Sequence, residues 1–142
     1  MSTIIATMVL TIAIEIGIPP YFVLAIALEE NWTLNPNAVS PQNENGTVDL
    51  GIMQLNSRYY GDIDWRDPEV NIRAGCLHIK ALMDHPGLNT YWDVAVSYNC
   101  GYWRFISEEG PPMVSIEYGC KVMKRWLDLT GMKNINPIIS GR

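Results

Sequence analysis

Two apolar stretches at the start of the chain constrain its fold more than any other feature of the sequence. Residues 3–14 contain no charged side chain, and residues 21–30 are apolar up to a final pair of glutamates. Ser2 can cap a first helix that Gly17 ends, and Pro20 suits the first turn of a second helix. We therefore expect the chain to begin with two consecutive apolar helices.

The first stretch is too short to cross a membrane. Glu15 interrupts it well before the ~20 apolar residues that a span requires. No Lys or Arg precedes it, and no small-residue cleavage site of a signal peptide follows it. We expect a buried helix, no stable membrane insertion and no export signal, with a membrane anchor as the alternative.

Length and composition predict one globular domain that covers residues 1–142. The formal net charge of −5 and the lack of a basic stripe exclude nucleic acid as the main partner. Cys76, Cys100 and Cys120 are too few for a disulfide scaffold and lack the spacing of zinc ligands. We expect these cysteines to be small core residues, and we expect no metal site and no cofactor.

The remaining sequence predicts a mainly helical fold with a small β element. Residues 31–46 are rich in Asn, Pro, Ser and Gly and indicate a loop, whereas residues 47–55 suit a short strand or hairpin arm. One helix should begin at Asp67-Pro68 and end before Pro86, and another should cover residues 91–98. A last helix, after Pro112, should pack through a stripe formed by Val114, Tyr118, Val122 and Trp126.

Glu29 and Glu30 lie at the end of the second apolar helix. A carboxyl group held against apolar surroundings favours its neutral form and can serve as a general acid. A pair of surface glutamates would explain the same residues, although acids at a helix C-terminus oppose the helix dipole. The helix alone leaves both interpretations open.

Four sequence blocks lie around these glutamates and after them. They are residues 25–40, 45–56, 67–75 and 95–101, and they include Gly-Ile-Met-Gln at 51–54 and Tyr-Asn-Cys-Gly at 98–101. In their order and separation, the blocks resemble the lysozyme-like superfamily. Within it they resemble the soluble lytic transglycosylase (SLT) domain of glycoside hydrolase family 23, including the small secretion-system and phage transglycosylases. The resemblance spans about residues 14–126 and implies an α+β fold, in which a small β-hairpin or loop element forms one side of a glycan-binding cleft.

The resemblance assigns the catalytic acid/base to Glu30. Counting without gaps from residues 25–27 leads to Glu30 and not to Glu29, because an insertion would rotate a helix by ~100° per residue but is easily absorbed in a loop. Asn31 stands where the family usually has Ser, and the stretch before Asn35 is one residue longer than is usual.

Asp49 has two interpretations. Its surroundings also resemble the part of animal c-type lysozymes that carries their second catalytic carboxylate, and lysozyme is itself the reference case for two-carboxylate catalysis. Asp49 would then stabilise the positive charge that develops on the sugar ring. Alternatively, it is a turn residue that binds local main-chain amides.

The family also implies further site residues. Tyr98 corresponds to its active-site tyrosine. We expect substrate contacts from Met53, Gln54, Asn99, Tyr118, Trp32 and Tyr59. Tyr60, Tyr102 and Trp103 are further loop aromatics that can pack against sugars, whereas Trp65, Trp92 and Trp126 suit the core. Core packing explains Tyr118 equally well. Either a positive φ angle or a close approach of the backbone to the ligand explains the glycines at positions 51 and 101.

The expected function is therefore that of a peptidoglycan lytic transglycosylase, which cleaves between N-acetylmuramic acid and N-acetylglucosamine and leaves 1,6-anhydromuramyl ends. A hydrolytic lysozyme that uses Glu30 and Asp49 is one alternative, and a non-catalytic glycan-binding or virion structural module is another. The expected place of action is the periplasmic or extracellular cell wall. The route there is open and includes a phage lysin or tail component, or a larger secretion assembly.

Overall fold

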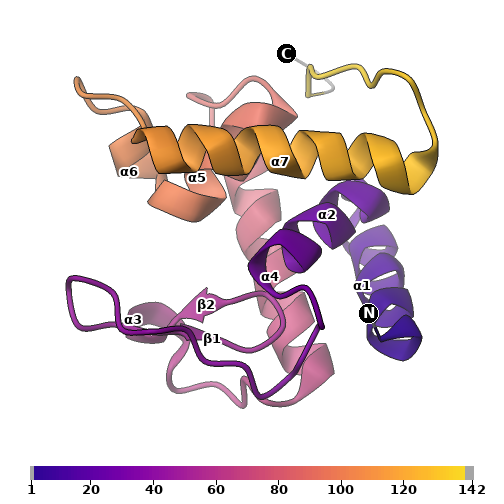
Figure 1. Cartoon of the computed structure of the whole chain (residues 1–142), viewed down its shortest axis with the longest axis vertical. Coiled ribbons are helices and arrows are strands. Elements are labelled where there is room, and N and C mark those ends of the chain that lie inside the picture. Colours follow the sequence, from indigo (N-terminus) through magenta and orange to yellow (C-terminus); the bar gives the residue numbers. More distant parts are fainter. Residues whose placement is uncertain (1, 140–142) are drawn as a thin grey trace. The chain divides into compact units, whose positions relative to one another are not determined.

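The computed structural model describes residues 2–139, and within them seven helices accompany one two-stranded antiparallel sheet (Figure 1). The elements are α1 (Thr3–Ile16), α2 (Pro20–Glu30), β1 (Asp49–Leu50), β2 (Leu55–Asn56), α3 (Ser57–Tyr60), α4 (Pro68–Met83), α5 (Tyr91–Cys100), α6 (Tyr102–Phe105) and α7 (Met113–Thr130). The mainly helical α+β class expected for a lysozyme-like chain is confirmed. The chain divides into an N-terminal unit, Met1–Leu77, and a C-terminal unit, His78–Arg142, with the boundary inside α4.

The first two helices have the ends that the sequence predicts. The Ser2 hydroxyl accepts a hydrogen bond from the Ile5 N–H at 3.3 Å, and Gly17 ends α1 in the left-handed conformation, with φ +86°. Pro20 occupies the first turn of α2, which packs against α1 (Figure 1). Only one face of α1 is buried, since Ile4 is 76% exposed. Among the described residues, no helix has the length and apolar character needed to cross a membrane.

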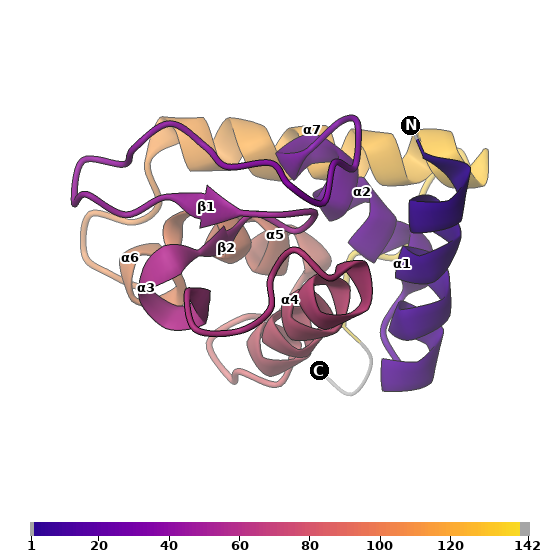
Figure 2. The same ribbon diagram turned by 90° about the horizontal axis from the view of Figure 1, so that it is seen from below.

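The β element is smaller than the sequence suggests. Its two strands, β1 and β2, lie side by side (Figure 2). They have two residues each, and Asp49 pairs with Asn56 and Leu50 with Leu55. Residues 51–54 form a turn between the strands, so the predicted strand over residues 47–55 is wrong in its central part. The short helix α3, which follows β2 directly, is absent from the sequence-based prediction.

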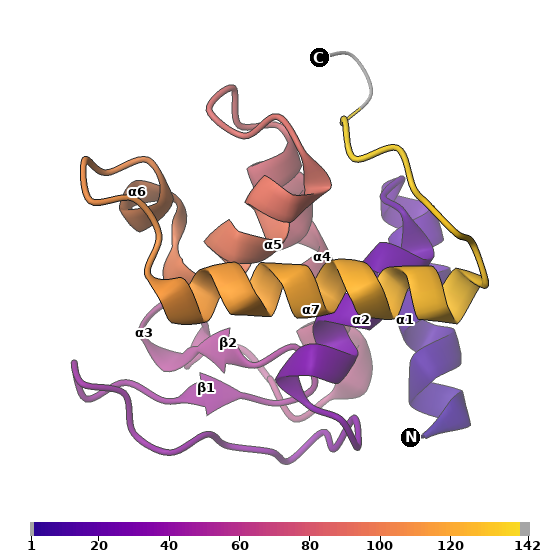
Figure 3. The same ribbon diagram turned by 45° about the horizontal axis from the view of Figure 1, so that its top comes forward.

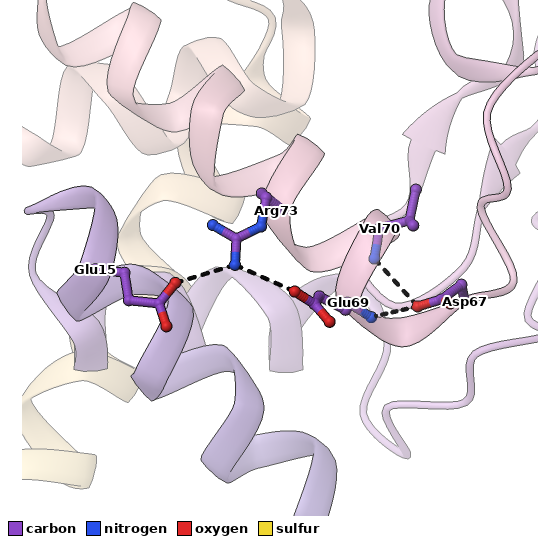
Figure 4. A network of polar contacts seen from close by, with 5 residues as sticks. All are labelled: Glu15, Asp67, Glu69, Val70 and Arg73. Atoms are coloured by element: carbon purple, nitrogen blue, oxygen red, sulfur yellow. Dashed lines mark hydrogen bonds and ion pairs between the residues drawn. The ribbon is translucent and has the colours of Figure 1, made fainter.

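Helix α4 begins and packs as predicted. The Asp67 carboxylate accepts hydrogen bonds from the main-chain N–H groups of Glu69 and Val70, at 2.9 and 3.3 Å (Figure 4). The predicted stripe of Ile72, Cys76 and Ile79 is completely buried.

Arg73 links the first turn of α4 to α1. Its guanidinium lies 3.0 Å from the Glu15 carboxylate and 3.4 Å from that of Glu69 (Figure 4). All three side chains are exposed, so solvent and salt screen the attraction, and these pairs contribute little to stability.

The C-terminal unit is built on the contact between α5 and α7 (Figure 3). A Cβ atom at Gly119 would lie 2.5 Å from Val96 Cγ2 and 3.0 Å from Trp92 Nε1. Real Cβ atoms essentially never come this close to a heavy atom, so glycine allows α7 to approach α5. The ring of Trp126 meets that of Tyr91 edge to face, at a centroid distance of 5.2 Å.

The apolar stripe predicted for α7 is correct over its last three members only. Tyr118, Val122 and Trp126 are buried, but Val114 is 67% exposed. Because α7 starts at Met113, Val114 lies in its first turn, and it is the neighbouring Ser115 that faces α5 there, with its hydroxyl donating to Asn99.

The expectation that all three cysteines are core residues is wrong for two of them. Only Cys76 is buried, whereas Cys100 is half-buried and Cys120 is exposed, and all three are free thiols. Burial raises the pKa of Cys76 to about 12, so this thiol stays protonated at neutral pH. Trp92 is likewise half-buried and not a core residue, although its ring lies close to Gly119 on α7.

Replacing Gly119 with Ala is expected to lower the free energy of unfolding by about 1–3 kcal/mol, because the new methyl group must displace Val96 or separate the two helices. Cys120→Ala is the matched control, since this neighbouring side chain is exposed and its loss should change stability by less than about 0.5 kcal/mol. Urea denaturation measures both. Equal stabilities for the two variants would show that the helices do not pack as closely as described.

Candidate active site

The carboxyl end of α2 carries the two glutamates. Residues 22–28 are buried, and Glu29 and Glu30 are both half-buried at the point where the helix emerges from the core. The Asn31 N–H donates to the Ala27 carbonyl at 2.8 Å and closes the last turn. Negative side chains here oppose the helix dipole. An unfavourable local placement of this kind is typical of functional sites.

The side chain of Asn31 fixes this end of α2. Its Nδ2 donates to the Asn35 carbonyl at 2.9 Å and to the Gly51 carbonyl at 3.3 Å, and its Oδ1 accepts from the Asn35 N–H at 3.2 Å. Asn31 is only 9% exposed. The residue next to Glu30 is thus bound both to the following loop and to the turn between the two strands.

That turn has two residues with positive φ. Gly51 has φ +73° and Gln54 has φ +52°, a conformation that is uncommon and costly for a residue with a side chain. The Gln54 amide offsets part of this cost, because its Nε2 donates to the Gly51 carbonyl at 2.9 Å. The Gly51 carbonyl therefore receives side-chain amides from both Asn31 and Gln54.

Asn71, on α4, holds the turn through hydrogen bonds to main-chain groups. It is completely buried, accepts from the Met53 N–H at 2.8 Å and donates to the carbonyls of Leu50 and Trp65 at 3.0 and 3.1 Å. A Cβ atom on Gly51 would lie 2.3 Å from the Asn71 amide nitrogen. The glycine is thus required both by its φ angle and by the close approach of Asn71.

Asp49 lies on β1, two residues before Gly51. Its carboxylate accepts from the side-chain amides of Asn43 and Asn56 at 3.5 and 3.4 Å, and both amides also donate to the Thr47 hydroxyl. These partners are neutral side chains and not the local main-chain amides of a turn-stabilising Asp. The carboxylate is half-buried, and its role in catalysis stays a prediction.

The C-terminal unit contains the other predicted catalytic residue, Tyr98, on α5. Tyr98 is half-buried, and its ring lies 5.5 Å from that of His78, tilted by 49°. Burial lowers the pKa of His78, which therefore remains neutral at pH 7. Tyr98 thus lies against an uncharged ring.

Two of the predicted substrate-binding residues lie on helices of the C-terminal unit. Asn99 follows Tyr98 on α5, and Tyr118 lies on α7. Asn99 is exposed, and its Oδ1 accepts a 2.7 Å hydrogen bond from the buried Ser115 hydroxyl, which orients the amide. Tyr118 is only 8% exposed, as core packing requires. The roles of both residues in substrate binding stay predictions.

The other predicted substrate contacts differ in exposure. Trp32 and Tyr59 are 59% and 74% exposed in the N-terminal unit, so each offers an aromatic face. Gln54 is half-buried, whereas Met53 is completely buried, and its side chain occupies the space next to Gly75. Packing thus explains Met53, and any contact with a glycan would involve its main chain.

A second aromatic group lies around α6, which the sequence-based prediction does not contain. Tyr102 stacks on His85 at a centroid distance of 3.5 Å and meets Trp103 edge to face at 5.2 Å. Trp103 is 78% exposed. Gly101, before this helix, has φ +89° and no atom near a would-be Cβ, so conformation and not close approach explains this glycine.

Sequence reasoning did not find the roles of Asn31 and Asn71. Asn31 is noticeable in the sequence because it follows the predicted catalytic residue Glu30 at a position where the family resemblance leads us to expect Ser. Asn71 lies beside the buried Ile72 at the start of a predicted helix, where a buried amide needs partners. Among the described residues, no group of three His, Cys, Asp or Glu side chains could hold a metal ion.

A comparison with protein families identifies the class to which this fold and these residues belong. The model of the transglycosylase SLT domain matches residues 9–111, which is more than half of the chain. The chain therefore belongs to the transglycosylase SLT domain family, and the resemblance of the sequence to an SLT domain is confirmed. Members of this family have transglycosylase-type lytic activity on the peptidoglycan of the cell wall. A comparison with curated proteins gives no match.

Proposed function

We propose that the protein is a lytic transglycosylase that cleaves the β-1,4 bond between N-acetylmuramic acid and N-acetylglucosamine and forms 1,6-anhydromuramyl ends. Family membership supports the general reaction and the substrate. The observation that carries the assignment to Glu30 is its place at the end of a buried helix, next to an asparagine bound to the strand-connecting turn.

In the first step, the protonated Glu30 donates to the glycosidic oxygen while the bond to the muramyl C1 breaks. The sugar acquires positive charge, which the neighbouring N-acetyl group stabilises. In the second step, the Glu30 carboxylate removes the proton from the muramyl C6 hydroxyl, and the C6 oxygen bonds to C1. Glu30 ends in its initial protonated form, so the cycle needs neither water nor a cofactor.

The other residues are proposed to position the substrate and to stabilise charge. Tyr98 and Asp49 would act on the cation-like sugar, Asp49 through a carboxylate that neutral amides hold in place. Gln54, Asn99 and the exposed rings of Trp32 and Tyr59 would contact the glycan, since aromatic faces pack against the apolar faces of sugars. The expected place of action is the periplasmic or extracellular cell wall.

Mass spectrometry of the fragments released from purified peptidoglycan tests the reaction type. We expect muramyl ends that are lighter by one water than hydrolysed ends, because the C6 hydroxyl replaces water as the nucleophile. A commercial muramidase provides the hydrolysed reference. Fragments that carry only reducing muramyl ends would contradict the transglycosylase assignment.

Hydrolysis by a lysozyme-type mechanism is the second candidate, and the surroundings of Asp49 favour it. A half-buried carboxylate that accepts from two asparagine amides suits the second acid of a two-carboxylate glycosidase. Asp49→Asn discriminates between the two candidates in the same product analysis. Under this alternative, the native protein yields reducing ends and the variant loses most of its activity, whereas a transglycosylase would still yield anhydro ends after the substitution.

A further inference from the structure

Two buried asparagines hold the turn between β1 and β2, and they differ in what else they touch. Asn71 is 0% exposed and binds only main-chain groups of the turn, its flanking strand and Trp65. Asn31 is 9% exposed and binds the Gly51 carbonyl from the end of α2. Of these two asparagines, Asn31 is therefore the one that joins the end of α2, directly after Glu30, to the turn.

The bonds of Asn31 require a side-chain amide. Toward Asn35, its Oδ1 accepts from the N–H at 3.2 Å while its Nδ2 donates to the carbonyl at 2.9 Å, and the same Nδ2 reaches the Gly51 carbonyl at 3.3 Å. A carboxylate has no donor for the two carbonyls, and a serine hydroxyl has a single donor. The asparagine at position 31 thus makes contacts that a serine there would be unable to make.

A series of few contacts leads from Glu30 to the strand that contains Asp49. Asn31 is bonded to Gly51, which follows β1 directly, and β1 contains Asp49 opposite Asn56. The Gln54 amide, bound to the same carbonyl at 2.9 Å, holds the other end of the turn. A movement of the end of α2 relative to β1 would therefore strain the hydrogen bond from Asn31 to the Gly51 carbonyl, whereas the two bonds to Asn35 hold the loop that follows the helix.

We propose that Asn31 is a positioning residue that holds Glu30 in register with the strand bearing Asp49. The proposal rests on the proposed function of Glu30, and it adds a residue that acts through Glu30 without touching the substrate. A misplacement of about 1 Å in a reacting group can cost about 100-fold in rate, so loss of the hydrogen bonds of Asn31, next to the acid, is expected to slow the reaction.

The test compares Asn31→Ala with Asn71→Ala, because both remove a buried amide that holds the same turn. We expect Asn31→Ala to lower kcat on soluble glycan strands by about 10- to 100-fold with KM changed less than about 3-fold. Asn71→Ala should destabilise the protein at least as much but keep kcat within about 3-fold, measured where each variant is fully folded. Equal losses of kcat in the two variants, or a loss confined to KM, would overturn the proposal.

A second control covers the case in which Asn71→Ala does not fold. Thr33→Ala removes the longest contact of the Asn31 amide, a 3.4 Å bond from an exposed residue, and leaves the bonds to Asn35 and Gly51 intact. This variant should retain the native kcat. A loss as large as that of Asn31→Ala would contradict the proposal.

A measurement without turnover separates this proposal from the proposed function. The carbon-13 signal of the Glu30 carboxyl, assigned by its absence in Glu30→Gln, should shift in Asn31→Ala and remain in place in Thr33→Ala. If the native protein releases no fragments while this pattern holds, the proposed function fails and the positioning role stands. An unchanged signal in Asn31→Ala overturns the positioning role, whatever the activity.

Discussion

Glu30→Gln is expected to lower the rate of peptidoglycan cleavage about 10³-fold or more, since the amide has the shape of the acid but is unable to deliver a proton to the leaving oxygen. The substitution should leave the fold intact because Glu30 is only half-buried, at the end of a helix whose apolar residues form the core contacts. Turbidity of a peptidoglycan suspension measures the rate, and circular dichroism the fold.

Glu29→Gln is the matched control for this experiment. It makes the same chemical change one position earlier in α2, at a residue that is also half-buried. We expect this variant to keep most of the native activity, because one residue rotates a side chain by ~100° around the helix. Loss of activity in Glu29→Gln with retention in Glu30→Gln would transfer the acid role to Glu29.

The same pair of variants also tests whether the protein is a binding module. A non-catalytic module has no cleavage activity to lose. Its binding to the wall would be the same in Glu30→Gln as in the native protein, because binding does not depend on proton transfer. Cosedimentation with insoluble peptidoglycan measures binding separately from cleavage. We expect Glu30→Gln to remain bound to the wall while releasing no fragments.

Gly51→Ala is expected to lower the free energy of unfolding by about 3 kcal/mol, the largest effect on stability that we predict. The φ of +73° costs a residue with a Cβ about 1–2 kcal/mol. The new methyl would also lie 2.3 Å from the Asn71 amide and 2.9 Å from the Trp65 carbonyl. Displacing Asn71 leaves buried main-chain groups without partners, at a further cost of about 1–3 kcal/mol.

Gly17→Ala separates the conformational cost of a positive φ from the steric cost of displacing Asn71. Gly17 has a similar φ of +86°, but no atom lies within 4 Å of a would-be Cβ, so only the conformational cost applies. We expect a loss of about 1 kcal/mol for Gly17→Ala and a fall in Tm of about 10 °C for Gly51→Ala. Calorimetry measures both. Similar Tm values for the two variants would mean that Asn71 does not pack against Gly51 as described.

The Gly51 substitution should also reduce activity, since Asn31 and Gln54 both donate to the Gly51 carbonyl. If the turn is displaced, the hydrogen bond from Asn31, at the end of α2, to the Gly51 carbonyl is lost. We therefore expect the cleavage rate of Gly51→Ala to fall even at temperatures where the variant is folded, whereas the rate of Gly17→Ala should remain close to native.

Helix ends and buried helix faces were predictable because their signals are local. The Ser2 and Asp67 caps, the Gly17 terminator and Pro20 in a first turn all act within one or two helical turns of their own position. The stripe of Ile72, Cys76 and Ile79 follows from helical periodicity alone.

Periodicity failed where an element is short or where a neighbouring helix ends. It predicts neither α3 nor α6, which have four residues each and no room for an apolar stripe. It also places Val114 in the core, although Val114 lies in the first turn of α7 and is 67% exposed. Cys120 was expected in the core because of its small size, but it is exposed. The size of a side chain does not determine which way it faces.

By itself, the sequence determined the mainly helical class, the ends of the long helices, the family and the position of the glutamate pair. Only the tertiary structure decided how that pair is held, because the contacts of Asn31 with Gly51 and of Asn71 with Met53 join residues 20 and 18 positions apart. Capping and periodicity act over a few residues, whereas a buried amide takes its partners from whichever carbonyls and N–H groups the folded chain brings within about 3 Å.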